Sequence, residues 1–206
     1  MASATETETD RVLAGYAGLG PDWIARSDGL NCDEIYAPVA DLLPLQPSRV
    51  LDLGAATGRD AAWLADKGHR VTAVEPVRRL SEAGQRLHPH GAIDWIDDRL
   101  PELPRLDGAE RYDCVLANGV LHHLEPAAQV AAIRRLADLV EPGGVLIVSL
   151  RHGDGPEGRR AWPIDVGLLI ERARGCGLKL RRRVDKGSVQ PENRAAGIAW
   201  TWLALG

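Results

Sequence analysis

Small residues follow a short apolar stretch early in the chain, and an acid stands just before them. Residues 50–53 are mostly apolar and predict a buried strand, and residues 61–65 predict the inner face of a helix that ends at Gly68. The backbone N–H groups of the connecting loop and the first helical turn lack partners within a helix, so they can bind a ligand. The predicted ligand loop contains Asp52, Gly54, Ala55, Ala56 and Gly58.

A second acid stands at the end of the next predicted strand. Residues 69–74 form this strand, and Glu75 follows it, 21 positions after Gly54. In a strand–helix–strand unit, an acid at this position is well placed to accept hydrogen bonds from both hydroxyls of a ribose. The loop and Glu75, with the adjoining Pro76, therefore predict a binding site for a ligand that contains a nucleoside.

The spacing of the small residues separates two kinds of nucleoside ligand. A dinucleotide loop needs glycines at its first, third and sixth positions, where this chain has Gly54, Ala56 and Arg59. The order Asp52-x-Gly54-x-Ala56-x-Gly58 instead resembles the loop of class I S-adenosylmethionine-dependent methyltransferases. We expect Ala56 to be tolerated because alanine fits where a backbone must come close without adopting a positive φ.

The same resemblance recurs after the third and fourth predicted strands. Asp97 and Asp98 follow the strand at residues 92–96. The resemblance implies that one of these acids accepts a hydrogen bond from the exocyclic amine of adenine, and the sequence leaves the choice open. Asn118 follows the strand at residues 111–117 and is expected to lie beside the cofactor.

His123 is the candidate catalytic residue. The resemblance places the loop after the fourth strand near the transferred methyl group, where an imidazole can act as general base for a hydroxyl or amine acceptor. A structural role, with the ring bonded to a neighbouring loop, is the alternative. The turn Pro142-Gly143-Gly144 before the fifth predicted strand, residues 145–150, is a second feature shared with the family.

Three further residues are candidates for contact with the substrate. Tyr16 lies in helices that precede the first strand, and in these methyltransferases such helices fold over the cofactor; ordinary packing is the alternative. Arg151 and His152 directly follow the fifth strand, at the edge where open α/β sheets bind ligands. Thr57 and Asp60, in contrast, predict a capping box that starts the helix after the ligand loop.

The alternation of strands and helices through Leu150 predicts a parallel sheet with helices on both faces. Residues 178–184 and 197–205 predict two more strands, which are similar to the closing hairpin of the family, and residues 185–196 predict a polar loop between them. The expected fold class is α/β, a Rossmann-like doubly wound, mostly parallel seven-stranded sheet with a closing antiparallel hairpin.

Residues 1–48 precede this repeat and are expected to supply an N-terminal tail and lid helices. Residues 49–206 are expected to form the S-adenosylmethionine-binding methyltransferase domain, and the two parts together one compact domain. The predicted elements of the first part are a tail at 1–9, a helix at 10–19 that ends at Gly20-Pro21, and a helix at 33–43.

Composition excludes several classes of protein. The net charge of −4 argues against a broad nucleic-acid surface. No apolar run reaches the roughly 20 residues that a membrane span requires, and the N-terminus lacks the core of a signal peptide. Three cysteines far apart in the chain lack metal-ligand spacing, so no metal site is expected. These features favour a cytoplasmic protein without a membrane or nucleic-acid partner.

The function implied by the resemblance is methyl transfer from S-adenosylmethionine to a small-molecule acceptor at oxygen, nitrogen or sulfur, as in compact bacterial methyltransferases. A non-catalytic S-adenosylmethionine-binding protein is one alternative. A nicotinamide-dependent oxidoreductase is another, although Arg59 stands where its loop needs glycine. The oligomeric state and the acceptor are left open.

Overall fold

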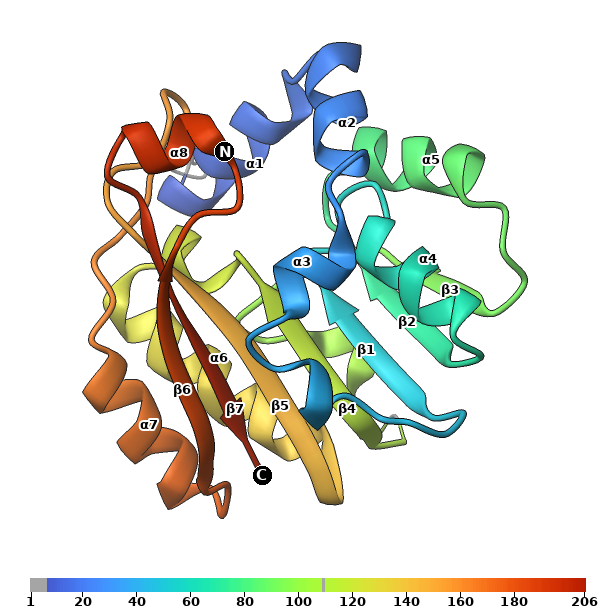
Figure 1. The fold of residues 1–206 in the computed structure, drawn as a ribbon, viewed down its shortest axis with the longest axis vertical. Helices are drawn as coiled ribbons and strands as arrows, with labels where there is room; N and C mark the ends of the chain where they lie inside the picture. The colour runs from blue at the N-terminus through green and yellow to red at the C-terminus, as the bar shows by residue number, and fades with distance from the viewer. Residues whose placement is uncertain (1–6, 109) are drawn as a thin grey trace, which may run out of the picture.

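A seven-stranded sheet forms the centre of the protein (Figure 1). The computed structural model describes residues 7–108 and 110–206. The strand order is β3-β2-β1-β4-β5-β7-β6, and all neighbours are parallel except those that involve β7. The predicted fold class is therefore confirmed. The strands are β1 Arg49–Leu53, β2 Arg70–Val74, β3 Ile93–Ile96, β4 Tyr112–Asn118, β5 Val140–His152, β6 Leu180–Gly187 and β7 Ala199–Leu205.

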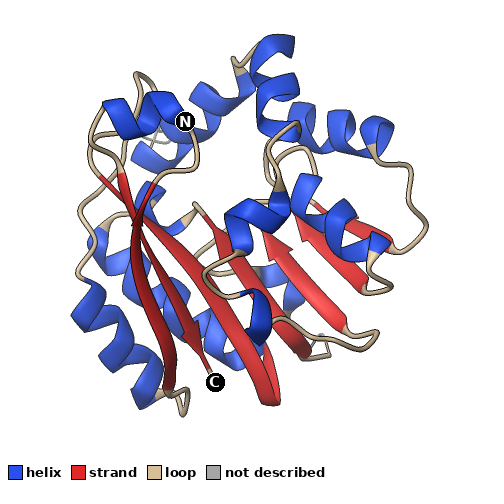
Figure 2. Cartoon of the chain, in the orientation of Figure 1, coloured by secondary structure: helices blue, strands red, loops and turns tan. Residues whose placement is uncertain are grey.

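Helices cover both faces of the sheet and its upper edge in the view of Figure 2. The α-helices are α1 Glu8–Ala17, α2 Pro21–Asp28, α3 Cys32–Tyr36, α4 Arg59–Asp66, α5 Arg78–Leu87, α6 Pro126–Leu139, α7 Val166–Gly175 and α8 Pro191–Ala195. Three single 3₁₀ turns are η1 Ala40–Leu42, η2 Pro104–Leu106 and η3 Leu121–His123.

Alternation along the strands builds two apolar cores, one on each face of the sheet. Leu51, Val115 and Leu146 point to the face covered by α6 and α7. Val50 and Cys114, one position away from the first two, point to the opposite face, which α3 and α4 cover. Because the parallel strands are buried on both sides, they read in the sequence as nearly continuous apolar runs.

Prolines account for most of the differences from the predicted elements. The first predicted helix ends before Gly20-Pro21, as expected, but Pro21 opens α2, a helix that was not predicted. Pro191 opens α8 inside the predicted loop at 185–196. Proline is well tolerated in the first helical turn, where its missing N–H has no partner in any case. The helix expected at 33–43 ends at Tyr36, because Pro38 cannot continue it.

Two other elements, α1 and β5, begin earlier than predicted. Residues 1–6 of the predicted tail lie outside the described residues, whereas Thr7 caps α1 in a capping box with Asp10. β5 begins at Val140 and includes the predicted turn before residue 145, with a register jump against β4 between Tyr112 and Cys114. Across the described part of the chain, no helix is long and apolar enough to cross a membrane.

Candidate functional site

The predicted ligand loop joins β1 to α4 and has an unusual backbone. Gly54, Ala56 and Gly58 adopt positive φ angles of 66°, 50° and 75°. The expectation that Ala56 avoids a positive φ is therefore wrong. An alanine in the left-handed region costs about 1–2 kcal/mol, and here the Ala56 N–H gains a buried acceptor by turning toward Glu75.

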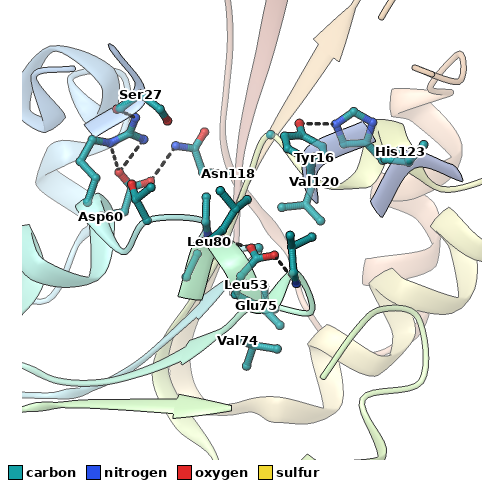
Figure 3. A pocket seen from close by; sticks show the side chains of 18 of the residues that line it. Tyr16, Ser27, Leu53, Asp60, Val74, Glu75, Leu80, Asn118, Val120 and His123 are labelled. Atoms are coloured by element: carbon teal, nitrogen blue, oxygen red, sulfur yellow. Dashed lines mark hydrogen bonds and ion pairs between the residues drawn. The ribbon is translucent and has the colours of Figure 1, made fainter. Parts of the chain in front are cut away.

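Glu75 follows β2 and lies beside this loop, and both of its carboxylate oxygens accept backbone hydrogen bonds (Figure 3). Its Oε2 accepts from the Ala56 N–H and its Oε1 from the Val77 N–H, each at 2.8 Å. Burial raises the pKa of Glu75 to about 7, although both hydrogen bonds lower it, and the carboxylate of Asp97 raises it further. Each oxygen still has a lone pair to offer a ligand hydroxyl.

A cavity of about 280 Å³ opens above the loop and Glu75. It lies at the carboxyl ends of β1, β2 and β4, where ligands of open α/β sheets bind. Nine of the predicted site residues line it: Tyr16, Gly54, Ala55, Ala56, Glu75, Pro76, Asp98, Asn118 and His123. Five do not: Asp52, Gly58, Asp97, Arg151 and His152.

Asp97 and Asp98, the two acids of which one was predicted to contact adenine, differ in their surroundings. Asp98 is buried, and its two oxygens accept from the N–H groups of Arg99 at 2.9 Å and Arg105 at 2.8 Å. Asp97 is exposed. Of the two acids, only Asp98 lies at the cavity wall, with an ordered loop behind it.

Asp52 lies beneath the loop rather than in the cavity. Burial, followed by the nearby carboxylate of Asp60, raises its pKa well above the ordinary value, and the Ala61 N–H lowers it. Its Oδ2 has no hydrogen-bond partner. This position fits a group that supports the loop from below.

Asp60 is part of the cavity wall, and the predicted capping box is wrong. Gly58 occupies the N-cap of α4 and makes no side-chain cap. Asp60 instead accepts from the Tyr36 hydroxyl at 2.8 Å, from Asn118 Nδ2 at 2.9 Å and from Arg59 Nε at 2.7 Å. Through Asn118 and Tyr36, the Asp60 carboxylate joins β4 to α3 across the site.

The other end of Asn118 is also fixed. Its Oδ1 accepts from the Ser149 hydroxyl at 2.6 Å, and the same hydroxyl oxygen accepts from the Gly119 N–H at 2.9 Å. Asn118 is thus held at both ends of its amide, which sets the direction of the chain as it leaves β4.

Tyr16 and His123, 107 positions apart, meet at the cavity (Figure 3). His123 Nδ1 lies 2.8 Å from the Arg160 carbonyl, which only accepts, so Nδ1 carries the proton. Nε2 is then an acceptor, and the Tyr16 hydroxyl donates a hydrogen bond to it at 2.8 Å. Burial lowers the pKa of His123 to about 4, which keeps the ring neutral.

Arg151 and His152 are engaged outside the cavity. Arg151 Nη1 donates to the Gly153 carbonyl at 3.0 Å and to the Asp154 carbonyl. His152 Nε2 lies 2.8 Å from the Thr201 hydroxyl, which itself donates to Asp185. Both side chains therefore hold the loop and strands beside the site.

Sequence reasoning missed several residues of the cavity wall. Trp200, Trp202 and Lys186, from the two closing strands, line it. The alternation of side chains along a strand places Trp200 and Trp202 on one face of β7, but nothing in the sequence showed what that face covers. Arg59, considered only as a missing glycine, also lines the cavity.

A doubly wound sheet with a ligand loop after β1, an acid after β2 and a cavity above both defines a nucleoside-binding α/β protein. Residues 29–180 match the family model described as a methyltransferase domain. The chain belongs to this methyltransferase family.

Curated relatives are similar over part of their length. The chain is 37% identical over 125 residues to the ubiquinone biosynthesis O-methyltransferase of Methylocella silvestris, a match that covers 60% of this chain and 46% of that protein. It is 36% identical over 132 residues to an uncharacterized methyltransferase of Mycobacterium tuberculosis, covering 60% of this chain and 64% of that protein. The chain thus spans about half to two thirds of these relatives.

Solved structures share the fold over nearly the whole chain. The 1,6-didemethyltoxoflavin-N1-methyltransferase of Burkholderia thailandensis, with its substrate and S-adenosylhomocysteine bound, matches with a TM-score of 0.65 and 26% identity, covering 100% of this chain and 91% of that one. The magnesium protoporphyrin IX methyltransferase of Synechocystis matches with a TM-score of 0.75 and 19% identity, covering 99% of each chain. The second match shows the fold alone.

Proposed function

We propose that this protein transfers a methyl group from S-adenosylmethionine to a small-molecule acceptor at oxygen, nitrogen or sulfur. The observation that carries the proposal is the loop at residues 54–58, bent by three positive φ angles, beside the buried carboxylate of Glu75 in one cavity. The family match and the structure with bound S-adenosylhomocysteine support it.

The chain has groups that fit each part of this cofactor. Glu75 would accept from the two ribose hydroxyls, and the closely approachable backbone at Gly54 and Ala55 would adjoin the amino-acid part. Asp98, rather than the exposed Asp97, would face the adenine, because only Asp98 lies at the cavity wall. Asn118 would lie beside the sulfur because it ends β4, next to β1 in the sheet.

The cofactor supplies an electrophilic methyl group, so the protein's task is to position the acceptor and exclude water. The lid helices α1 and α2 line the cavity through Val12, Tyr16 and Trp23. Tyr16 and His123 both line the cavity. For an acceptor that must lose a proton, the Tyr16 hydroxyl would take that proton as it gives its own to His123 Nε2, to which it is hydrogen-bonded. His123 therefore acts through Tyr16, which differs from the direct base that the sequence suggested.

Residues 1–48, as far as they are described, serve in this proposal as the lid on the domain formed by residues 49–206. The three cysteines are free thiols, two of them buried, which is consistent with action in a bacterial cytoplasm. The acceptor is proposed to be a small molecule and not a nucleic acid, given the net charge of −4.

Calorimetric titration with S-adenosylhomocysteine, with NADH as a parallel control, tests the cofactor assignment. Micromolar binding of S-adenosylhomocysteine alone is the expected result. Binding of NADH alone would refute the proposal in favour of an oxidoreductase. A screen of small acceptors with labelled methyl donor then separates an enzyme from a non-catalytic binding protein, because only the enzyme yields a methylated product.

A further inference from the structure

Lys186 lies on the same face of the sheet as the aromatic wall of the cavity. In β6, Val184 pairs with Trp202 and Lys186 pairs with Trp200 in β7. Val184, Trp200 and Trp202 all pack in the core on the α3 and α4 side. Because side chains two positions apart share a face, Lys186 points to this side as well, and it lines the cavity.

Lys186 has no ion partner among the residues that the structure describes. The other two permanent cations that line the cavity are paired, Arg59 with Asp60 and Arg99 with Asp10. Arg182, four positions before Lys186 on the same face, is paired with Asp41. An unpaired ammonium at a mostly apolar cavity attracts an anion.

Trp200 connects this ammonium to the centre of the site. A Cβ added at Gly119 would lie 3.4 Å from the Trp200 ring, so the indole covers the loop that follows β4. The ring also meets His122 edge-on, with centroids 6.0 Å apart. A planar group that stacks on Trp200 would lie between Lys186 and the end of β4.

The position of Lys186 separates it from the predicted nucleoside end of the cofactor. β6 lies five strands away from β2 in the sheet order, a separation of roughly 24 Å at the usual spacing. Glu75 at the end of β2 and Lys186 at the end of β6 therefore mark opposite ends of the cavity.

We propose that the acceptor is a planar aromatic or heteroaromatic anion, whose ring stacks on Trp200 and whose carboxylate is bound by Lys186. This inference rests on the proposed function, because it assigns the cofactor to the other end of the cavity. Lys186 of β6 and Trp200 of β7 would then be a pair of residues that determines which acceptor is bound. A single ammonium favours a carboxylate over the neutral amide of the same shape by about tenfold or more.

Two probes of equal shape test the charge preference: 6-hydroxy-2-naphthoate and 6-hydroxy-2-naphthamide. Each is titrated into ¹⁵N-labelled protein saturated with S-adenosylhomocysteine, and the indole N–H resonance of Trp200 is followed, assigned with Trp200→Phe. The test variant is Lys186→Gln. The matched control is Lys179→Gln, an exposed lysine just before β6 that does not line the cavity.

The expected result is that the acid shifts the Trp200 resonance and binds about tenfold tighter than the amide. Lys186→Gln should bring the two affinities within about twofold, whereas Lys179→Gln keeps the preference. Equal affinities in the unmodified protein, a preference that survives Lys186→Gln, or no shift of Trp200 with either probe would overturn the inference. Weaker S-adenosylhomocysteine binding in Lys186→Gln would also overturn it, since the lysine would then serve the cofactor. Absence of S-adenosylhomocysteine binding by the unmodified protein refutes the proposed function itself.

Discussion

If Glu75 binds the ribose as proposed, its buried carboxylate should make cofactor affinity depend on pH near neutrality. Burial raises its pKa to about 7 from an ordinary value of 4.5. In the free protein the folded state favours the protonated form of Glu75. The contribution of this group to the free energy of unfolding is therefore fully present below pH 4.5 and is lost as pH rises through 7, a loss of about 3 kcal/mol. Ribose hydroxyls donate to the ionised form, so a bound nucleoside stabilises the carboxylate and lowers its pKa again.

The magnitude follows from the fraction of Glu75 that is ionised before binding. With a pKa of about 7, most of the free protein carries the carboxylate at pH 8 and only about a tenth does at pH 6. The affinity for S-adenosylhomocysteine should therefore fall about tenfold from pH 8 to pH 6. At the lower pH, binding should release nearly one proton. His123, with a pKa of about 4, does not titrate in this window.

Calorimetry at pH 6, 7 and 8, in two buffers with different ionisation enthalpies, measures both the affinity and the protons released. Glu75→Gln should bind about tenfold or more weakly at pH 8, because the amide places a donor against a backbone N–H, and its affinity should not change with pH. Glu102→Gln, at an exposed acid near the same edge, is the matched control and should behave as the unmodified protein. An affinity that stays constant from pH 6 to 8 in the unmodified protein would refute this reasoning.

Three further substitutions test the loop and the proton path. Ala56→Gly removes the cost of a left-handed alanine and should raise the free energy of unfolding by about 0.5–1 kcal/mol, seen as a melting temperature about 1–3 °C higher; a lower melting temperature would contradict the assigned backbone. Gly54→Val should abolish S-adenosylhomocysteine binding, because an added Cβ would lie 2.5 Å from a neighbouring side chain at a φ of 66°, whereas Gly91→Val, in open space, should bind normally. Tyr16→Phe should lower kcat for a hydroxyl acceptor about tenfold or more without changing cofactor affinity; an unchanged kcat would remove Tyr16 and His123 from the proton path.

The repeating part of the fold was predictable from the sequence because local signals determine it. Apolar runs of strand length, small residues at turns and periodic helices predicted β1 to β5 and the helices between them. The place of Glu75 beside the loop was predictable from its position alone, since the strand–helix–strand unit brings the end of its second strand next to the loop after the first. The errors at prolines were also local: the predicted helix at 33–43 ran through Pro38, which ends it, and the helices that Pro21 and Pro191 begin were not predicted, because proline starts helices as well as ending them.

The acceptor side of the site was decided only by the tertiary structure. Tyr16 meets His123 across 107 positions, and Lys186 meets the cavity through the pairing of β6 with β7. The role of Ala56 depends on a φ angle that its residue type does not favour, and the role of Asp60 depends on the arrival of Tyr36 and Asn118 from distant elements. Sequence patterns report which face of an element is apolar, whereas the partner that each face or side chain meets depends on the packing of all the elements together. This is why the loop after β1 was predictable and the part of the cavity wall from β6 and β7 was not.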